Sequence, residues 1–264
     1  MRRDVSARLT CRVAGPATLL FSTAVSGRGW TVDERFTLRV AGRRVEPTEF
    51  TDHYGSRLHQ YVGGPDHVEL DYAATVLGRA QSPGAEPIDL ATFLRPSRYC
   101  ESDTLTPTAQ AQFGGLSGGY LLAAVAGWVH DTLDYVSGSS LPTDGAVRTL
   151  LARQGVCRDF AHLTIALLRA RDVPARLVSV YAPGLDPMDF HAVCEAWVDG
   201  VWQVVDATWL APRQALVRIA TGRDAADTAF LTNNGAELVL EEMEVTAVAG
   251  ELPADDWTTP CRLS

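Results

Sequence analysis

The chain has 264 residues, of which 46% are hydrophobic and 21% are charged. A chain of this size and composition can bury a core without disulfide support, which excludes global disorder. Its 32 acidic and 23 basic residues give a net charge of −9, which argues against nucleic acid or an acidic membrane as the main partner.

The cysteines are few and widely spaced: Cys11, Cys100, Cys157, Cys194 and Cys261. They form no CxxC pair and are odd in number, so the sequence predicts neither a zinc site nor a disulfide framework. A partly apolar stretch follows Arg2 and Arg3, but Gly15 and Pro16 interrupt it, so we do not read it as a signal peptide. We therefore expect a cytoplasmic protein with no metal and no cofactor, and the oligomeric state stays open.

Residues 1–85 predict a small all-β module. Strand-like runs of alternating or apolar residues occur at 6–13, 17–25, 36–40, 54–62 and 67–76. The last two runs flank Gly63-Gly64-Pro65-Asp66, and this turn predicts that they pair as a hairpin. Short strands at this spacing are typical of a sandwich or barrel. The prolines and glycine of 81–87 mark the end of the module.

The pattern changes to helical periodicity after this boundary. Apolar spacing predicts helices over 120–133, 145–154 and 157–171, followed by strands over 175–181, 191–198, 202–207 and 238–248. Helices followed by an antiparallel run of strands indicate an α+β fold. We therefore predict a β module at 1–85, a catalytic domain at 95–250 and a tail at 251–264.

Cys157 is the first candidate for chemistry because it directly follows Gly155-Val156 at a predicted helix start. A helix N-terminus has free N–H groups and a partial positive charge, which favour a thiolate and can bind an oxyanion. The alternative is that Cys157 is a small buried apolar residue, which is the commoner case for a cysteine taken at random.

A predicted hairpin supplies the context that favours the nucleophile. Asp199-Gly200 is a strong two-residue turn, so paired residue numbers across it sum to 399. His191 and Asp206 then lie on the same face as diagonal neighbours, within reach of each other. A carboxylate on one imidazole nitrogen fixes the tautomer and presents the other nitrogen to a nucleophile. Cys194 lies on the opposite face, so the pairing selects Cys157.

Each of these residues also has a structural interpretation. His191 can be a strand histidine with an ordinary hydrogen bond, and Asp206 can be a turn residue. His162 is the main rival base, but it lies five residues along the helix from Cys157 and so faces elsewhere.

Several motifs resemble the bacterial transglutaminase-like family, within the transglutaminase and papain-like group of thiol enzymes. They are Gly155 to Leu163, Val173 to Arg176, Asp189 to Ala192, Val205 to Thr208, Arg218 to Asp227 and Pro96 to Tyr99. The resemblance covers most of residues 95–230 specifically and residues 1–85 loosely. It departs from the commoner pattern at Val193, where that pattern has an aromatic residue.

The resemblance implies a papain-like or transglutaminase-like core of helices packed on an antiparallel sheet. It also implies a Cys157 nucleophile, a His191 base and an Asp206 that orients the histidine. We therefore expect an enzyme that cleaves amide or peptide bonds of a peptide, protein or small amide through an acyl-cysteine intermediate. Transfer of the acyl group to an amine is the first alternative, and a non-catalytic binding module that retains the fold is the second.

Overall fold

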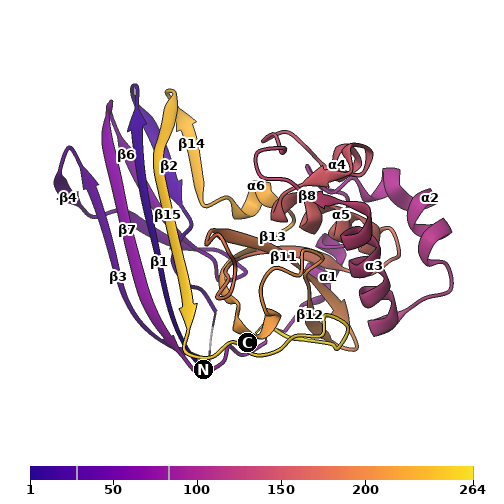
Figure 1. Cartoon of the computed structure of the whole chain (residues 1–264). Coiled ribbons are helices and arrows are strands. Elements are labelled where there is room, and N and C mark those ends of the chain that lie inside the picture. The colour runs from indigo at the N-terminus through magenta and orange to yellow at the C-terminus, as the bar shows by residue number, and fades with distance from the viewer. Residues whose placement is uncertain (28, 83, 264) are drawn as a thin grey trace.

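A β sandwich and a mixed helical and sheet region lie side by side in the computed structural model (Figure 1). The structure describes residues 1–27, 29–82 and 84–263. Three residues lie outside the described residues: 28 and 83, in the predicted β module, and 264, in the predicted tail. The architecture is the predicted α+β one, with an all-β region formed largely by the N-terminal residues.

The sandwich consists of two antiparallel sheets that face each other across an apolar core. Within the described residues, one sheet has the order β15-β1-β7-β3-β4 and the other has the order β14-β2-β6-β5. The N-terminal strands are β1 (Arg2–Val13), β2 (Ala17–Phe21), β3 (Thr31–Val40), β4 (Arg43–Val45), β5 (Thr48–Thr51), β6 (Arg57–Gly63) and β7 (Asp66–Leu77). Alternation of apolar and polar residues along β1 buries one face of that strand, as its sequence predicts.

The predicted hairpin of 54–62 with 67–76 is wrong. Strand β6 pairs with β2 and β5 in one sheet, whereas β7 pairs with β1 and β3 in the other. The turn between β6 and β7 therefore carries the chain from one sheet of the sandwich to the other. A glycine-rich turn of this length permits both outcomes, and burial of the apolar face of each strand decides between them.

The chain returns to the sandwich near its C-terminus. Strand β14 (Leu231–Gly235) pairs with β2, and β15 (Leu238–Ala249) pairs with β1 over nearly its whole length. Strand β15 confirms the predicted late strand at 238–248. The division into units at 1–85, 95–250 and 251–264 stays a prediction, but the end of the second range supplies two strands to the sheets of the first.

The second region packs helices on an antiparallel sheet of order β12-β11-β10-β13. Its helices are α1 (Pro87–Thr92), α2 (Ser102–Phe113), α3 (Gly118–Thr132), α4 (Ala146–Ala152), α5 (Cys157–Arg169) and α6 (Ala225–Thr228), with a short 3-10 turn at Arg213–Ala215. Its strands are β8 (Asp134–Tyr135), β9 (Gln154–Gly155), β10 (Ala175–Tyr181), β11 (Phe190–Val198), β12 (Val201–Val205) and β13 (Val217–Gly222). Leu163 and Leu167 of α5 share a buried cluster with Leu177 and Cys194 of the sheet.

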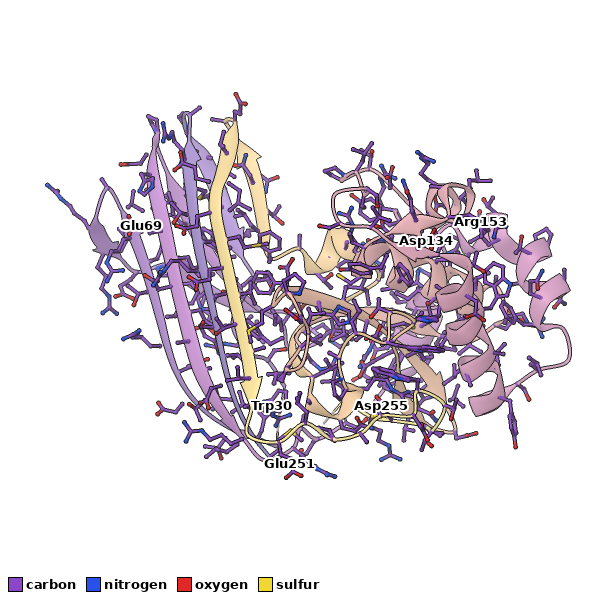
Figure 2. All side chains as sticks on the ribbon, viewed as in Figure 1. Trp30, Glu69, Asp134, Arg153, Glu251 and Asp255 are labelled. Atoms are coloured by element: carbon purple, nitrogen blue, oxygen red, sulfur yellow. The ribbon has the colours of Figure 1, made fainter. Side chains whose placement is uncertain are left out.

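Two further features join the regions. Tyr181 of β10 and Ile219 of β13, in the second region, belong to the apolar core of the sandwich. Trp30, near the base of the molecule in Figure 2, packs against that core and against the cluster behind the second sheet. The C-terminal segment also pairs with the sheet of the second region, where the N–H of Val204 on β12 donates a hydrogen bond to the carbonyl oxygen of Cys261 at 2.7 Å. The two regions therefore share apolar packing.

Candidate active site

Cys157 is the first residue of α5, as the sequence predicts. The side chain of Asp159 folds back and accepts a hydrogen bond from the N–H of Val156 at 2.8 Å. A Cβ atom at position 155 would lie 2.6 Å from the Cβ of Asp159, so only glycine fits there. Gly155 and Asp159 together fix the turn that places Cys157 at the positive end of the helix dipole. That position favours the thiolate form of a cysteine.

His191 and Asp206 are in contact, and both are buried. The register of β11 and β12 pairs Cys194 with Val205, which confirms the predicted sum of 399. The turn residues Asp199 and Gly200 have φ angles of 53° and 77°, as a tight two-residue hairpin loop requires. His191 Nε2 lies 2.8 Å from Asp206 Oδ2.

Asp206 is itself held by Thr208. Its Oδ1 atom accepts hydrogen bonds from the N–H of Thr208 at 2.9 Å and from the hydroxyl of Thr208 at 2.7 Å. Burial alone would raise the pKa of Asp206, but His191 and these hydrogen bonds outweigh it and lower the pKa below its usual value. The carboxylate is therefore charged and fixed in orientation.

The contact with Asp206 also determines the protonation of His191. Burial would lower the pKa of this imidazole, but the carboxylate of Asp206 and the side chain of Cys157 outweigh burial and raise the pKa to about 10. At neutral pH the imidazole therefore carries two protons. An imidazolium next to a thiol is the arrangement that stabilises a thiolate and can donate a proton to a leaving group.

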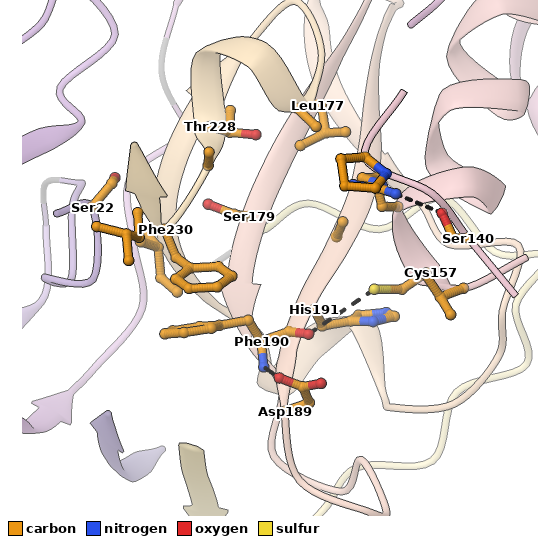
Figure 3. Close-up of a pocket in the computed structure, with 18 of the residues that line it drawn as sticks. Ser22, Ser140, Cys157, Leu177, Ser179, Asp189, Phe190, His191, Thr228 and Phe230 are labelled. Atoms are coloured by element: carbon orange, nitrogen blue, oxygen red, sulfur yellow. Dashed lines mark hydrogen bonds between the residues drawn. The ribbon is translucent and has the colours of Figure 1, made fainter. Parts of the chain in front are cut away.

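The thiol of Cys157 lies beside the pair formed by His191 and Asp206. Its Sγ atom lies 4.0 Å from the carbonyl oxygen of Phe190, the residue before His191. Figure 3 shows the thiol and the imidazole next to each other on the edge of one cleft. Among the described residues, Nδ1 of His191 has no hydrogen-bond partner, so it is available to the thiol or to a substrate. The structure therefore brings together at one site the three residues selected from the sequence, which are Cys157, His191 and Asp206.

Tyr135 belongs to this site and was missed by the sequence analysis. The parallel pairing of β8 with β9 aligns Tyr135 with Gly155, two residues before Cys157. The phenol interacts with both the N–H and the side chain of Cys157. Burial and the side chain of Cys157 raise the pKa of Tyr135 to about 12, against the opposing effect of that N–H, so the phenol is protonated at neutral pH.

The rival base lies elsewhere. His162 is fully buried, stacks on Tyr99 at 5.1 Å, and accepts a hydrogen bond from the N–H of Ala225 at its Nε2 atom. Burial lowers the pKa of His162 to about 3, so it remains neutral. Cys194 lies in the core between α5 and the sheet, and burial raises the pKa of its thiol far above the usual value. Neither residue lines the cleft.

The cleft beside Cys157 and His191 has a volume of about 620 Å³. Its floor is the sheet of order β12-β11-β10-β13. Its walls come from α5, the loop at 138–142, the segment after α6, and the sandwich. Ser140 of the loop is held by Arg158, whose Nη2 atom donates to the serine hydroxyl at 2.5 Å. The size is typical of a site for a ligand of a few residues.

Two kinds of feature are absent from the described residues. No group of three or more His, Cys, Asp or Glu side chains there is arranged to hold a metal ion. In the same residues, none of the helices combines the length and the apolar character needed to cross a membrane.

Comparison with known proteins places the chain in a family. A model described as "Transglutaminase-like superfamily" matches residues 109–207, which include Cys157, His191 and Asp206. A crystal structure of a protein from Cytophaga hutchinsonii, named a "putative cysteine protease", is 34% identical and superposes with a TM-score of 0.85, covering 100% of this chain and 94% of that one. The chain belongs to the transglutaminase-like superfamily. Its fold is therefore that of the superfamily's thiol enzymes.

Two relatives that are named as uncharacterised proteins match part of the chain. An uncharacterised protein of Mycobacterium leprae is 31% identical over 140 residues, which are 48% of this chain and 50% of that protein. An uncharacterised protein of Mycobacterium tuberculosis is 32% identical over 152 residues, which are 50% of this chain and 48% of that protein. The match therefore spans about half the length of these relatives.

Proposed function

We propose that this transglutaminase-like protein is a cysteine-dependent hydrolase that cleaves amide or peptide bonds through an acyl-cysteine intermediate. The observation that carries the proposal is the 2.8 Å contact between His191 and Asp206 at a cleft that also exposes the thiol of Cys157. The nucleophile, the base and the group that orients the base are then Cys157, His191 and Asp206. A cytoplasmic location and peptide, protein or small-amide substrates stay predictions.

The first half of the reaction forms a thioester. The thiolate of Cys157 attacks the substrate carbonyl carbon, and the negative charge moves to the carbonyl oxygen. We assign the stabilisation of that oxyanion to the N–H of Cys157 at the helix start and to the hydroxyl of Tyr135, which interacts with that N–H. His191 gives its Nδ1 proton to the substrate nitrogen, the C–N bond breaks, and the free amine leaves.

The second half consumes water. Neutral His191 takes a proton from a water molecule, and the resulting hydroxide attacks the thioester carbon. The C–S bond breaks, the carboxylic acid leaves, and the thiolate of Cys157 and the imidazolium of His191 are restored. Use of an amine in place of water would give acyl transfer, so the nature of the acceptor decides between hydrolase and transferase.

The test measures release of a fluorogenic amine from peptide amides, with and without an added primary amine. Cys157→Ala should abolish turnover at a stability cost within about 1–2 kcal/mol, because it removes one sulfur atom beside an open cleft. Cys194→Ala is the matched control and should retain activity, since its thiol lies in the core. Equal losses in two folded variants would contradict the assignment of the nucleophile. Product formed only with the amine would identify a transferase.

Alkylation separates an enzyme from a non-catalytic module. Iodoacetamide at neutral pH should label Cys157 first, since Cys11, Cys100, Cys194 and Cys261 are all buried and burial raises the pKa of each thiol. Mass spectrometry locates the label. If Cys157 reacts no faster than Cys261, the chain is a binding module that retains the fold.

A further inference from the structure

The far wall of the active-site cleft belongs to the β sandwich. Leu231 of β14 and Met243 of β15 line the cleft together with Ser22, which directly follows β2. In Figure 3, Ser22 and Phe230 lie on one side of the cleft and Cys157 and Ser140 on the other. The sandwich is therefore positioned to contact whatever group is attached to the carbonyl that Cys157 attacks.

The cleft beside this wall is apolar and uncharged. Phe190 of β11 and Phe230, which precedes β14, stack with ring centres 5.1 Å apart, and Ile219 of β13 also lines the cleft. Among the described lining residues outside the proposed triad, the charged side chains are Arg158 and Asp189. Both are sequence neighbours of triad residues, so they stand at the catalytic end. A charged group bound at the sandwich end would lose its water without gaining a partner.

Two serine hydroxyls lie just beneath the apolar surface. The Oγ atoms of Ser22 and Ser179 are buried and have no hydrogen-bond partner among the described residues. Both residues line the cleft. Rotation of either side chain about χ1 would turn its hydroxyl toward the cleft, where the amide groups of a peptide can pair with it and a hydrocarbon chain cannot. The cleft is therefore better suited to a peptide with apolar side chains than to a fatty acyl chain.

Resting on the proposed function, we propose that the acyl donor is a peptide whose large apolar side chains bind against the β sandwich. Met243 and Leu231 are then residues that determine specificity, although they lie outside the sheet that carries the triad. The cleft volume of about 620 Å³ accommodates a segment of two or three residues.

The substrate test compares donors with the same fluorogenic leaving group. The kcat/KM for Leu-Leu amides should exceed that for Glu-Glu and Lys-Lys amides by about 100-fold. Leucine side chains can leave water at the sandwich wall without a free-energy cost, whereas charged side chains cannot. The octanoyl amide of the same fluorogenic amine is the comparison for a fatty acyl donor. Equal rates for apolar and charged peptides would overturn the proposal. A higher kcat/KM for the octanoyl amide than for every peptide would also overturn it, in favour of an acyl chain.

A pair of variants on one strand tests the role of the sandwich. Met243 and Leu240 are 38% and 37% exposed on β15, but only Met243 lines the cleft. Met243→Glu should lower kcat/KM for the Leu-Leu donor by about 10-fold or more, and Leu240→Glu by less than about 2-fold. Equal effects of the two variants would remove the sandwich from the substrate site.

Labelling of Cys157 distinguishes failure of this inference from failure of the proposed function. Iodoacetamide is too small to need the far wall, so Met243→Glu should leave its reaction with Cys157 unchanged. If the wild-type protein cleaves no donor and Cys157 is unreactive, the proposed function is wrong and this inference falls with it. If the protein cleaves all peptides equally, only the inference about the sandwich is wrong.

Discussion

The ion pairs of the two regions differ in how deeply they are buried. Ion pairs of the sandwich, such as Arg8 with Asp71 and Arg44 with Glu46, lie on its exposed faces. The sheet of the second region buries its charges: Glu195 lies 2.7 Å from Arg176 and 2.6 Å from Arg218, and all three side chains are at most 5% exposed. Exposed pairs contribute little to stability, whereas breaking a buried pair leaves an uncompensated charge.

The difference has a structural use. Arg176, Glu195 and Arg218 stand on β10, β11 and β13, so the cluster ties together three neighbouring strands. Strand β11 also carries His191, and the pair of His191 with Asp206 ties that strand to the residue after β12. Buried charge is therefore concentrated where the geometry of the proposed triad must be fixed. The sandwich contributes only one wall of the cleft, and apolar packing is enough to hold that wall in place.

Among the variants that test this contrast, the largest effect is expected at the buried pair beside the thiol. Asp206→Asn keeps the shape of the side chain but cannot stabilise an imidazolium, so turnover should fall by about 10²–10⁴-fold. The protein should stay folded, as circular dichroism would show. An unchanged turnover would assign the orienting role to another residue and break the link between buried charge and catalysis.

The pH dependence of stability follows from the same pair. His191 has a pKa of about 10 in the folded protein, above its ordinary value of 6.5. The stabilising contribution is therefore complete below about pH 6.5 and is lost as the pH rises through about 10. Urea unfolding of the wild type at pH 7 and pH 10 should show this loss. Asp206→Asn should reduce it, because burial then lowers the pKa of His191 with less opposition.

How much of this site follows from sequence depends on the range of the interactions. The register of β11 with β12 is set by the local turn at Asp199 and Gly200, so the contact of His191 with Asp206 could be predicted. The helix start at Cys157 is equally local. Tyr135 was missed because the pairing of β8 with β9 is two residues long and leaves no periodic pattern.

The errors in the fold have the same origin. Strand β15 pairs with β1 across more than two hundred residues, and no local motif specifies that partner. The turn after β6 shows where the chain reverses but not which sheet the next strand joins. Helix α2 was missed because Pro107 lies inside it and its apolar residues are weakly periodic. The sequence therefore predicts local elements better than the way in which they assemble.

A smaller but still large effect is expected at the buried charge cluster. Burial would raise the pKa of Glu195, but the two arginines outweigh it and lower the pKa to about 2. Glu195→Gln leaves two buried guanidinium groups without a counter-charge and should cost about 3–5 kcal/mol of unfolding free energy in urea titrations. Asp71→Asn is the control in the sandwich and should cost less than about 1 kcal/mol. Similar losses of unfolding free energy in the two variants would show that ion pairs contribute equally to stability in the two regions.

The smallest effect is expected at Tyr135, whose side chain is polar but not sequestered. The residue is 45% exposed, so water can replace its hydroxyl as a donor to the oxyanion. Tyr135→Phe should therefore lower kcat by about 10-fold, less than the 10²–10³-fold typical of a buried oxyanion donor, with KM little changed. Alkylation of Cys157 by iodoacetamide forms no oxyanion, so its rate should stay the same. A rise in kcat would show that the hydroxyl, which interacts with the N–H of Cys157 in this structure, competes with the substrate for that group.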